Sequence, residues 1–337
     1  MDRFLPTASL SNIIYRSELL RAVRVFFDGF GFIEVQTPVL SADTVIDNYV
    51  EPLCVCDASL PINFHGSRNY YLQTSPEFAM KRLLAAGMDS IYQICPAFRC
   101  GDRGKLHNIE FTMLEWYRTG DNYETGMRLL AELVQAIFDN KVFQKIKKNF
   151  PPISFMRFDE IFCKYVGQSF RNLSIKEFSD IAKLRGVCYP DSYLVEGSEL
   201  LWIDLFFSEF AQPELNGVIV YDYPEGQSQL ACCGTDINGN KISERFELFL
   251  GGIEIANGYH ELSDAEELRE RLQNVAAKRE NEGKIKFPVE SRLLQAMESE
   301  SGLPPSSGTA LGIDRLLLYL LDANSIDDVI TFPIEYS

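Results

Sequence analysis

The segment His107–Arg118, HNIEFTMLEWYR, constrains the fold more than any other part of the sequence. Its order of apolar, aromatic and acidic residues predicts a β-strand, in which every second side chain points to the same face of a sheet. We therefore expect Phe111, Met113, Glu115 and Tyr117 on one face. An aromatic ring, a carboxylate and a phenol on one strand face are an unusual combination.

The residues before this strand predict a helix and a second strand. Residues 74–87, TSPEFAMKRLLAAG, place Ser75 at the N-cap, Pro76 in the first helical position and Gly87 at the stop. Residues 90–99, SIYQICPAFR, predict a strand that a polar loop, CGDRGKLHNI, joins to the first one. The sequence thus predicts a helix followed by a strand pair.

The N-terminal part predicts another helix that leads into a strand. Residues 12–28 carry apolar side chains at helical spacing, and Gly29 and Gly31 end that pattern. A strand is expected over residues 32–38, FIEVQTP, which ends at Pro38. The sequence contains no internal repeat and no linker rich in Pro, Gly and Ser, so we expect one continuous domain over residues 1–337.

A second group of acids lies in the segment RFELFLGGIEIANGYHEL, residues 245–262. Gly251 and Gly252 suit a two-residue hairpin turn between two strands. The register that this turn implies makes Glu247 and Glu254 diagonal neighbours on one face. Two carboxylates so placed suit Mg²⁺ and the phosphates of a nucleotide. The alternative from spacing alone is a solvated hairpin face.

The C-terminal segment SSGTALGIDRLLLYLL, residues 306–321, predicts a strand of small residues that runs into a helix. Gly308, Ala310 and Gly312 leave room beside the backbone, and Arg315 follows at the junction. This pattern fits close packing as well as binding.

Composition narrows the function classes. The 32 basic and 48 acidic residues give a net charge of −16, which argues against a broad nucleic-acid surface. The sequence has no run of about 18 apolar residues and no signal-peptide pattern at its start, so we expect no membrane span and a cytoplasmic protein. The 8 cysteines lack the spacing of a zinc site and are expected to be free thiols.

Three segments together resemble motifs 1, 2 and 3 of class II aminoacyl-tRNA synthetases. They are the helix and strand that end at Pro38, Phe98-Arg99 followed by His107 and Glu110-Phe111, and GTALGIDR at 308–315. The segments TSPEFAMKRLL, HNIEFTMLEWY, ERFELF and IEIANGYHEL are similar to the lysyl branch. The chain starts about ten residues before motif 1, where that branch carries an anticodon-binding barrel. In this it resembles the elongation factor P–(R)-β-lysine ligase family.

The resemblance implies an α+β fold, with a mainly antiparallel sheet flanked by helices. It implies an ATP-dependent, AMP-forming ligase that activates (R)-β-lysine or lysine as an adenylate and transfers it to a lysine side chain of elongation factor P. It also implies a homodimer through motif 1 and, with the acidic balance, no tRNA binding. Ala310 stands where lysyl-tRNA synthetases usually have glycine, and one methyl group can shift discrimination between isomers.

The resemblance also implies the roles of individual residues. Phe111 and Arg315 are expected to stack on the two faces of adenine, and Arg99 to hold the α-phosphate. The ATP-binding set is Arg99, Cys100, Gly101, His107, Asn108, Phe111, Glu247, Glu254, Ile255, Gly312 and Arg315. The substrate-binding set is Ser75, Pro76, Glu77, Glu115, Tyr117, Asn257, Tyr259, Glu261 and Ala310. The catalytic set is Arg99, Glu247 and Glu254, and the two glutamates are the expected Mg²⁺ ligands.

One departure from the family pattern lies in motif 2. The family usually reads FRNE, whereas this chain reads Phe98-Arg99-Cys100-Gly101 and then Asp102. The missing glutamate predicts weaker ATP binding unless Asp102 or backbone carbonyls replace it. Two alternatives therefore stay open, namely a ligase of the same fold with another acceptor, such as tRNA or a small molecule, and a non-catalytic regulatory paralogue.

Overall fold

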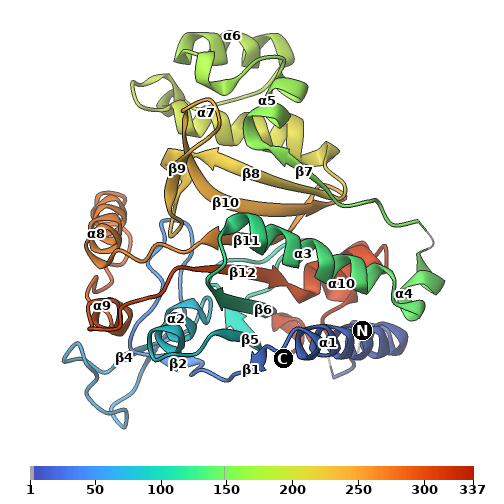
Figure 1. The fold of residues 1–337 in the computed structure, drawn as a ribbon, viewed down its shortest axis with the longest axis vertical. Helices are drawn as coiled ribbons and strands as arrows, with labels where there is room; N and C mark the ends of the chain where they lie inside the picture. Colours follow the sequence, from blue (N-terminus) through green and yellow to red (C-terminus); the bar gives the residue numbers. More distant parts are fainter. Residues whose placement is uncertain (1–3, 148) are drawn as a thin grey trace. The chain divides into compact units, whose positions relative to one another are not determined.

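The computed structural model describes residues 4–147 and 149–337 (Figure 1). The chain divides into two compact units, the first made of residues 1–150 and 258–337 and the second of residues 151–257. The division falls within one strand, β11, Ile253–His260. Our expectation of a single domain over residues 1–337 stays a prediction.

The first unit is built around a sheet in the order β1-β5-β6-β12. Strand β6 is antiparallel to both β5 and β12, whereas β1 is parallel to β5. A small antiparallel sheet, β2-β4-β3, belongs to the same unit. The strand bounds are β1 Ile33–Glu34, β2 Leu40–Ser41, β3 Cys54–Cys56, β4 Asn69–Leu72, β5 Ser90–Phe98, β6 Glu110–Thr119 and β12 Ser306–Gly312.

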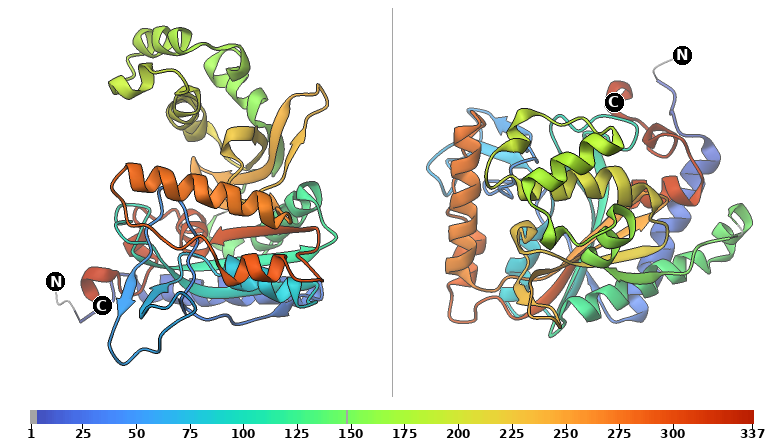
Figure 2. Two further views of the ribbon diagram at one scale, coloured as in Figure 1. Left: turned by 90° about the vertical axis from the view of Figure 1, so that its left-hand side faces the viewer. Right: turned by 90° about the horizontal axis from the view of Figure 1, so that it is seen from above.

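Seven α-helices in the described part of the first unit accompany these strands, and Figure 2 shows the longer ones, α1 in blue and α8 in orange. Their bounds are α1 Leu10–Gly29, α2 Glu77–Ala85, α3 Tyr123–Phe138, α4 Lys141–Ile146, α8 Ala265–Asn281, α9 Arg292–Met297 and α10 Ile313–Leu320. None of the helices in the described part of the chain has the length and apolar character that a bilayer span requires.

One face of β6 belongs to the core of the first unit. Trp116 is buried against Phe27 of α1, and the two ring centroids are 5.3 Å apart. Phe27 also stacks on Tyr92 of β5 at 4.6 Å. Because side chains alternate along a strand, this packing turns Glu115 and Tyr117 to the opposite face. The contact of Trp116 with Phe27 thus determines that Glu115 and Tyr117 lie on the face of β6 away from α1.

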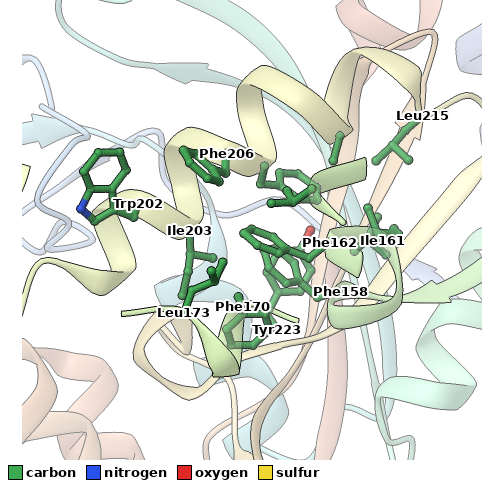
Figure 3. Close-up of a cluster of buried hydrophobic side chains, with 14 of the residues drawn as sticks. Phe158, Ile161, Phe162, Phe170, Leu173, Trp202, Ile203, Phe206, Leu215 and Tyr223 are labelled. Atoms are coloured by element: carbon green, nitrogen blue, oxygen red, sulfur yellow. The ribbon is translucent and has the colours of Figure 1, made fainter. Parts of the chain in front are cut away.

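The second unit has its own sheet and its own apolar core. Strand β8, Val218–Pro224, lies between β10, Lys241–Leu250, and β7, Ser154–Arg157, while β9, Cys233–Thr235, pairs with β10. Helices α5, α6 and α7 span Phe158–Val166, Ile175–Arg185 and Glu199–Phe206. Figure 3 shows the aromatic side chains that fill the core, among them Phe158, Phe162, Phe206 and Trp202.

Most of the expected elements are present, and the sheet is mainly antiparallel with flanking helices, as predicted. The strand expected over residues 32–38 is shorter, because the pairing of Ile33 and Glu34 with β5 ends after Val35 donates to the Tyr92 carbonyl. Helix α2 begins at Glu77, one residue later than expected, and Gly87 follows it with a φ of 98°.

Candidate active site

Glu115 is buried in the middle of β6 and is held by two hydroxyl groups. Ser75 Oγ donates to Glu115 Oε1 at 2.6 Å, and Tyr117 OH donates to Glu115 Oε2 at 2.9 Å. Ala310 of β12 is the register partner of Glu115. Burial, and next the negative charge of Glu77, raise the pKa of Glu115 to about 8. The strand face predicted from alternation therefore carries a carboxyl group that is mostly protonated at pH 7.

Two further buried glutamates lie on either side of a lysine. Lys81 Nζ is 2.6 Å from Glu77 Oε1 and 2.6 Å from Glu261 Oε2, and the Lys81 side chain is 3% exposed. Burial lowers the pKa of Lys81, but the charges of Glu261 and Glu77 outweigh it and leave the pKa raised, so Lys81 is protonated. We call Glu77, Glu115 and Glu261 the glutamate cluster.

Gly308 of β12 allows the glutamate cluster to pack against the strand. A Cβ atom at this position would lie 2.1 Å from Glu261 Oε1 and 2.3 Å from Cε1 of Tyr117. The room that the small residues of 306–312 were expected to leave is thus filled, at Gly308, by side chains of the chain itself. At Gly312 the nearest atoms, of Arg315, would be 3.8 Å away.

Four of the residues expected to bind ATP in the first unit form two contacting pairs. The Arg99 guanidinium carbon lies 5.2 Å from the centroid of the Phe111 ring. Arg315 Nη2 and His107 Nε2 are 2.5 Å apart. Arg99 Nε is buried and has no hydrogen-bond partner among the described residues. This nitrogen is thus a buried donor without an acceptor in the described part of the chain, beside the ring of Phe111.

The loop between β5 and β6 is anchored at several points. The Cys100 amide donates to the Glu51 carbonyl at 2.7 Å, and Gly101 has a φ of 84°. The side-chain amide of Asn108 donates to the Glu110 carbonyl at 2.7 Å and accepts from the Ile334 amide at 3.2 Å. Both ends of the Asn108 amide are therefore used within the chain. The left-handed backbone at Gly101 favours glycine at this position.

The expected metal ligands lie in the second unit. Tyr223 OH donates to Glu247 Oε2 at 2.8 Å, and Arg245 forms a short ion pair with Glu247 Oε1. Burial raises the pKa of Glu247; Arg245 opposes this rise, and the charge of Glu254 adds to it. Glu247 and Glu254 are thus close enough to repel each other. Gly251 and Gly252 have φ values of 58° and 75°, as a two-residue hairpin turn requires.

The remaining predicted residues occupy less informative positions. Ile255 is buried and Asn257 is half-buried, both in the second unit. The Tyr259 carbonyl accepts a hydrogen bond from Ser307 Oγ at 2.9 Å. Pro76 immediately precedes α2.

Sequence reasoning missed two cations that contact predicted site residues and a third that contacts the neighbour of one. Lys81 follows Glu77 by four residues on a helix, a spacing at which glutamate and lysine commonly pair. Arg245 precedes Glu247 by two residues on a strand and so shares its face. Arg16 of α1 contacts Asp314, the neighbour of Arg315, and only the fold reveals this contact. The first two could have been found from spacing.

Comparison with known proteins places this chain in a family. The model for class II tRNA synthetases (D, K and N) matches residues 4–336. An elongation factor P–(R)-β-lysine ligase of Haemophilus influenzae strain PittGG is 34% identical over 99% of this chain and 98% of its own length. The chain belongs to the elongation factor P–(R)-β-lysine ligase family.

Other members of this ligase family give the same result. Proteins with that name from Pasteurella multocida and Pectobacterium atrosepticum are 35% and 34% identical, over 99% and 98% of this chain and 98% and 97% of their own lengths. The resemblance stated from the motifs is thereby confirmed, as is the ligase type. Membership in the class II family also implies that the enzyme uses ATP.

Proposed function

We propose that the chain activates (R)-β-lysine with ATP as an adenylate and transfers it to a lysine side chain of elongation factor P. The observation that carries the proposal is the buried glutamate cluster, in a chain whose ligase relatives match it over nearly their whole length. A diamino acid brings two ammonium groups, which need carboxylates once they leave water. Glu115 forms no ion pair among the described residues, so it can accept an ammonium group.

We assign the activation step to residues of the first unit. Phe111 and Arg315 would hold the adenine ring, and His107 the outer phosphates. Arg99, with a buried nitrogen that lacks an acceptor, would hold the α-phosphate while the substrate carboxylate attacks it and pyrophosphate leaves. The acceptor amine would then attack the carbonyl carbon of the adenylate and release AMP. Catalysis in this scheme is positioning and charge neutralisation, without a protein nucleophile.

Glu247 and Glu254 are the proposed Mg²⁺ ligands. Their mutual repulsion and oxygen donors fit a small hard cation. When bound, Mg²⁺ would neutralise phosphate charge. Arg245 contacts Oε1 of Glu247. To bind Mg²⁺, Glu247 would have to release Arg245 in part or use Oε2, which accepts a hydrogen bond from Tyr223. We expect Glu254→Gln to raise the Mg²⁺ concentration needed for pyrophosphate exchange, with Glu225→Gln as the exposed control.

We further propose a homodimer that forms through α1 and β1. Large apolar side chains there are exposed to solvent, with Leu10 at 74%, Ile14 at 62%, Val25 at 66% and Ile33 at 55%. Exposed apolar surface of this extent on neighbouring elements is typical of an interface. Light scattering at micromolar concentration tests this, because a monomer would contradict it.

The acceptor, the cellular location and the domain organisation are proposed from the net charge and from the family. The net charge of −16 supports a protein acceptor over tRNA. We place the enzyme in the cytoplasm, where elongation factor P and ATP meet. Because the family model covers both compact units, we propose that they form one catalytic domain.

Mass spectrometry tests the proposed function directly. Elongation factor P is incubated with the enzyme, ATP and each lysine isomer, and the expected product is a lysine side chain that gains one β-lysyl group. Charging of tRNA is measured in parallel. Charged tRNA with unmodified elongation factor P would support the alternative acceptor, and no amino-acid-dependent pyrophosphate exchange would support the non-catalytic paralogue.

A further inference from the structure

Lys81 is a charged residue at the predicted substrate site to which the proposed function assigns no role. Its side chain is almost fully buried, and its ammonium lies 2.6 Å from an oxygen of Glu77 and 2.6 Å from an oxygen of Glu261. Glu77 lies one turn before it on α2, whereas Glu261 follows β11 and is 180 residues away in sequence. A single ammonium therefore joins two carboxylates from different elements.

The charge that Lys81 contributes changes what the glutamate cluster can accept. Glu77, Glu115 and Glu261 together with Lys81 carry a formal charge of −2 when all four groups are ionised. Without Lys81 the same groups would carry −3, and buried carboxylates so close together would take up protons. Two ammonium groups of a diamino acid would balance a charge of −2.

We propose that Lys81 determines the specificity for diamino acids by neutralising one of the three glutamate charges and holding Glu77 and Glu261 in place. This inference rests on the proposed function, because it assumes that the glutamate cluster binds the amino-acid substrate. Lys81 itself is a positioning residue, since it is proposed to act through the two carboxylates that its ammonium contacts.

The surroundings of the Lys81 ammonium contain the groups that such a role requires. Glu77 faces it from α2, and Glu261 from the end of β11. Glu115 and Tyr117 of β6 lie within electrostatic range of both glutamates, and His260 within range of Glu261. Burial raises the pKa of Glu261, and the charge of Lys81 opposes that rise. Loss of Lys81 should therefore leave a protonated carboxyl group at neutral pH.

The alternative role for Lys81 is purely structural, as a link between α2 and the end of β11. The two roles predict different results in a cycle of Lys81→Met, Glu77→Gln and the double variant. If Lys81 balances charge, Lys81→Met alone raises the KM for the diamino acid about 10-fold or more at pH 7. In the Glu77→Gln background, Glu115 and Glu261 carry −2 without Lys81 when both are ionised. Lys81→Met in that background should therefore lower the KM for the diamino acid.

If Lys81 is only a structural link, Lys81→Met should raise the KM for the diamino acid in both wild type and Glu77→Gln. That result, or an unchanged KM in Lys81→Met, would overturn the inference. If Lys81→Met alone does not fold, the comparison of Glu77→Gln with the double variant still decides. The double variant leaves no uncompensated charge between Glu77 and Lys81, so its folding should be least affected.

The pH dependence gives a second readout. The ratio of KM values, Lys81→Met over wild type, should fall from pH 7 to pH 9 as Glu115 and Glu261 ionise, and a ratio that stays constant contradicts the inference. The KM for ATP should change less than about 2-fold. Arg82→Met, which removes the exposed neighbouring cation on α2, is the matched control and should leave both KM values unchanged. If wild type itself shows no diamino-acid-dependent pyrophosphate exchange, the proposed function fails instead.

Discussion

Arg16 of α1 forms an ion pair with Asp314 of α10, and both residues also contact Thr112 of β6. Arg16 Nη2 donates to Thr112 Oγ1 at 2.5 Å, and the Thr112 amide donates to Asp314 Oδ2 at 2.7 Å. Thr112 follows Phe111, and Asp314 precedes Arg315. The ion pair therefore connects the backbone positions of the two residues expected to hold adenine.

We predict that Arg16→Leu destabilises the protein and weakens ATP binding. The side chains of Arg16 and Asp314 are 17% and 4% exposed, and removal of one partner from such a pair costs about 3 kcal/mol of unfolding free energy. Urea unfolding measures this loss, and pyrophosphate exchange measures the KM for ATP. Arg21→Leu, which breaks an exposed pair with Glu18 on the same helix, should cost less than about 0.5 kcal/mol. Equal costs for the two variants would contradict the prediction.

We predict that Gly308→Ala impairs amino-acid binding more than ATP binding. The new methyl group would lie 2.1 Å from Glu261 Oε1 and 2.3 Å from the Tyr117 ring, so both side chains must move. A displacement of that size should raise the KM for the amino acid about 10- to 100-fold. Gly29→Ala is the control, because a Cβ atom there meets nothing within 4 Å. A KM for the amino acid that stays at the wild-type value would contradict this account.

Local patterns predicted the parts of the site that single elements define. Alternation along β6 placed Glu115 and Tyr117 on one face, because a strand repeats every two residues. Adjacent glycines predicted the hairpin, since its turn needs positive φ at both positions. The pattern of residues 32–38 predicted a longer strand than β1. Strand β1 is shorter because a strand also requires a pairing partner, and β5 provides one only as far as Val35.

Contacts between elements that are far apart in sequence could not be predicted from local sequence patterns. The pairing of Lys81 with Glu261 depends on how α2 packs beside the end of β11, and no periodicity encodes that distance. The contact of Arg16 with Asp314 depends in the same way on α1 and α10. The raised pKa of Glu115 could not be predicted from sequence either, because it results from burial that only the assembled sheet produces.

We predict that binding of the amino acid releases a proton from Glu115. The pKa of this carboxyl group is raised to about 8, so it carries its proton at pH 7 in the absence of substrate. A bound ammonium group would favour the carboxylate, and the proton would leave. Calorimetry in buffers of different ionisation enthalpy should find close to one proton released per bound amino acid at pH 7 and about half at pH 8. The release should therefore decrease as the pH rises.

Two variants separate Glu115 from other sources of that proton. Glu115→Gln cannot release it, so the dependence of the binding enthalpy on the buffer should disappear. Glu110→Gln changes an exposed carboxylate on the same strand and should leave the release unchanged. Persistence of the full release in Glu115→Gln would assign the proton to another group.

We predict that restoring the usual motif 2 glutamate with Gly101→Glu does not improve ATP binding. The φ of 84° at Gly101 lies in the left-handed region, where a side chain costs about 1–2 kcal/mol. A Cβ atom there meets nothing within 4 Å, so the cost comes from the backbone alone. Urea unfolding should show that loss, and the KM for ATP should stay at or above the wild-type value. Gly104→Glu, where the φ is not left-handed and the space is also open, should cost less. A lower KM for ATP in Gly101→Glu would mean that the loop adopts another backbone conformation when the nucleotide binds.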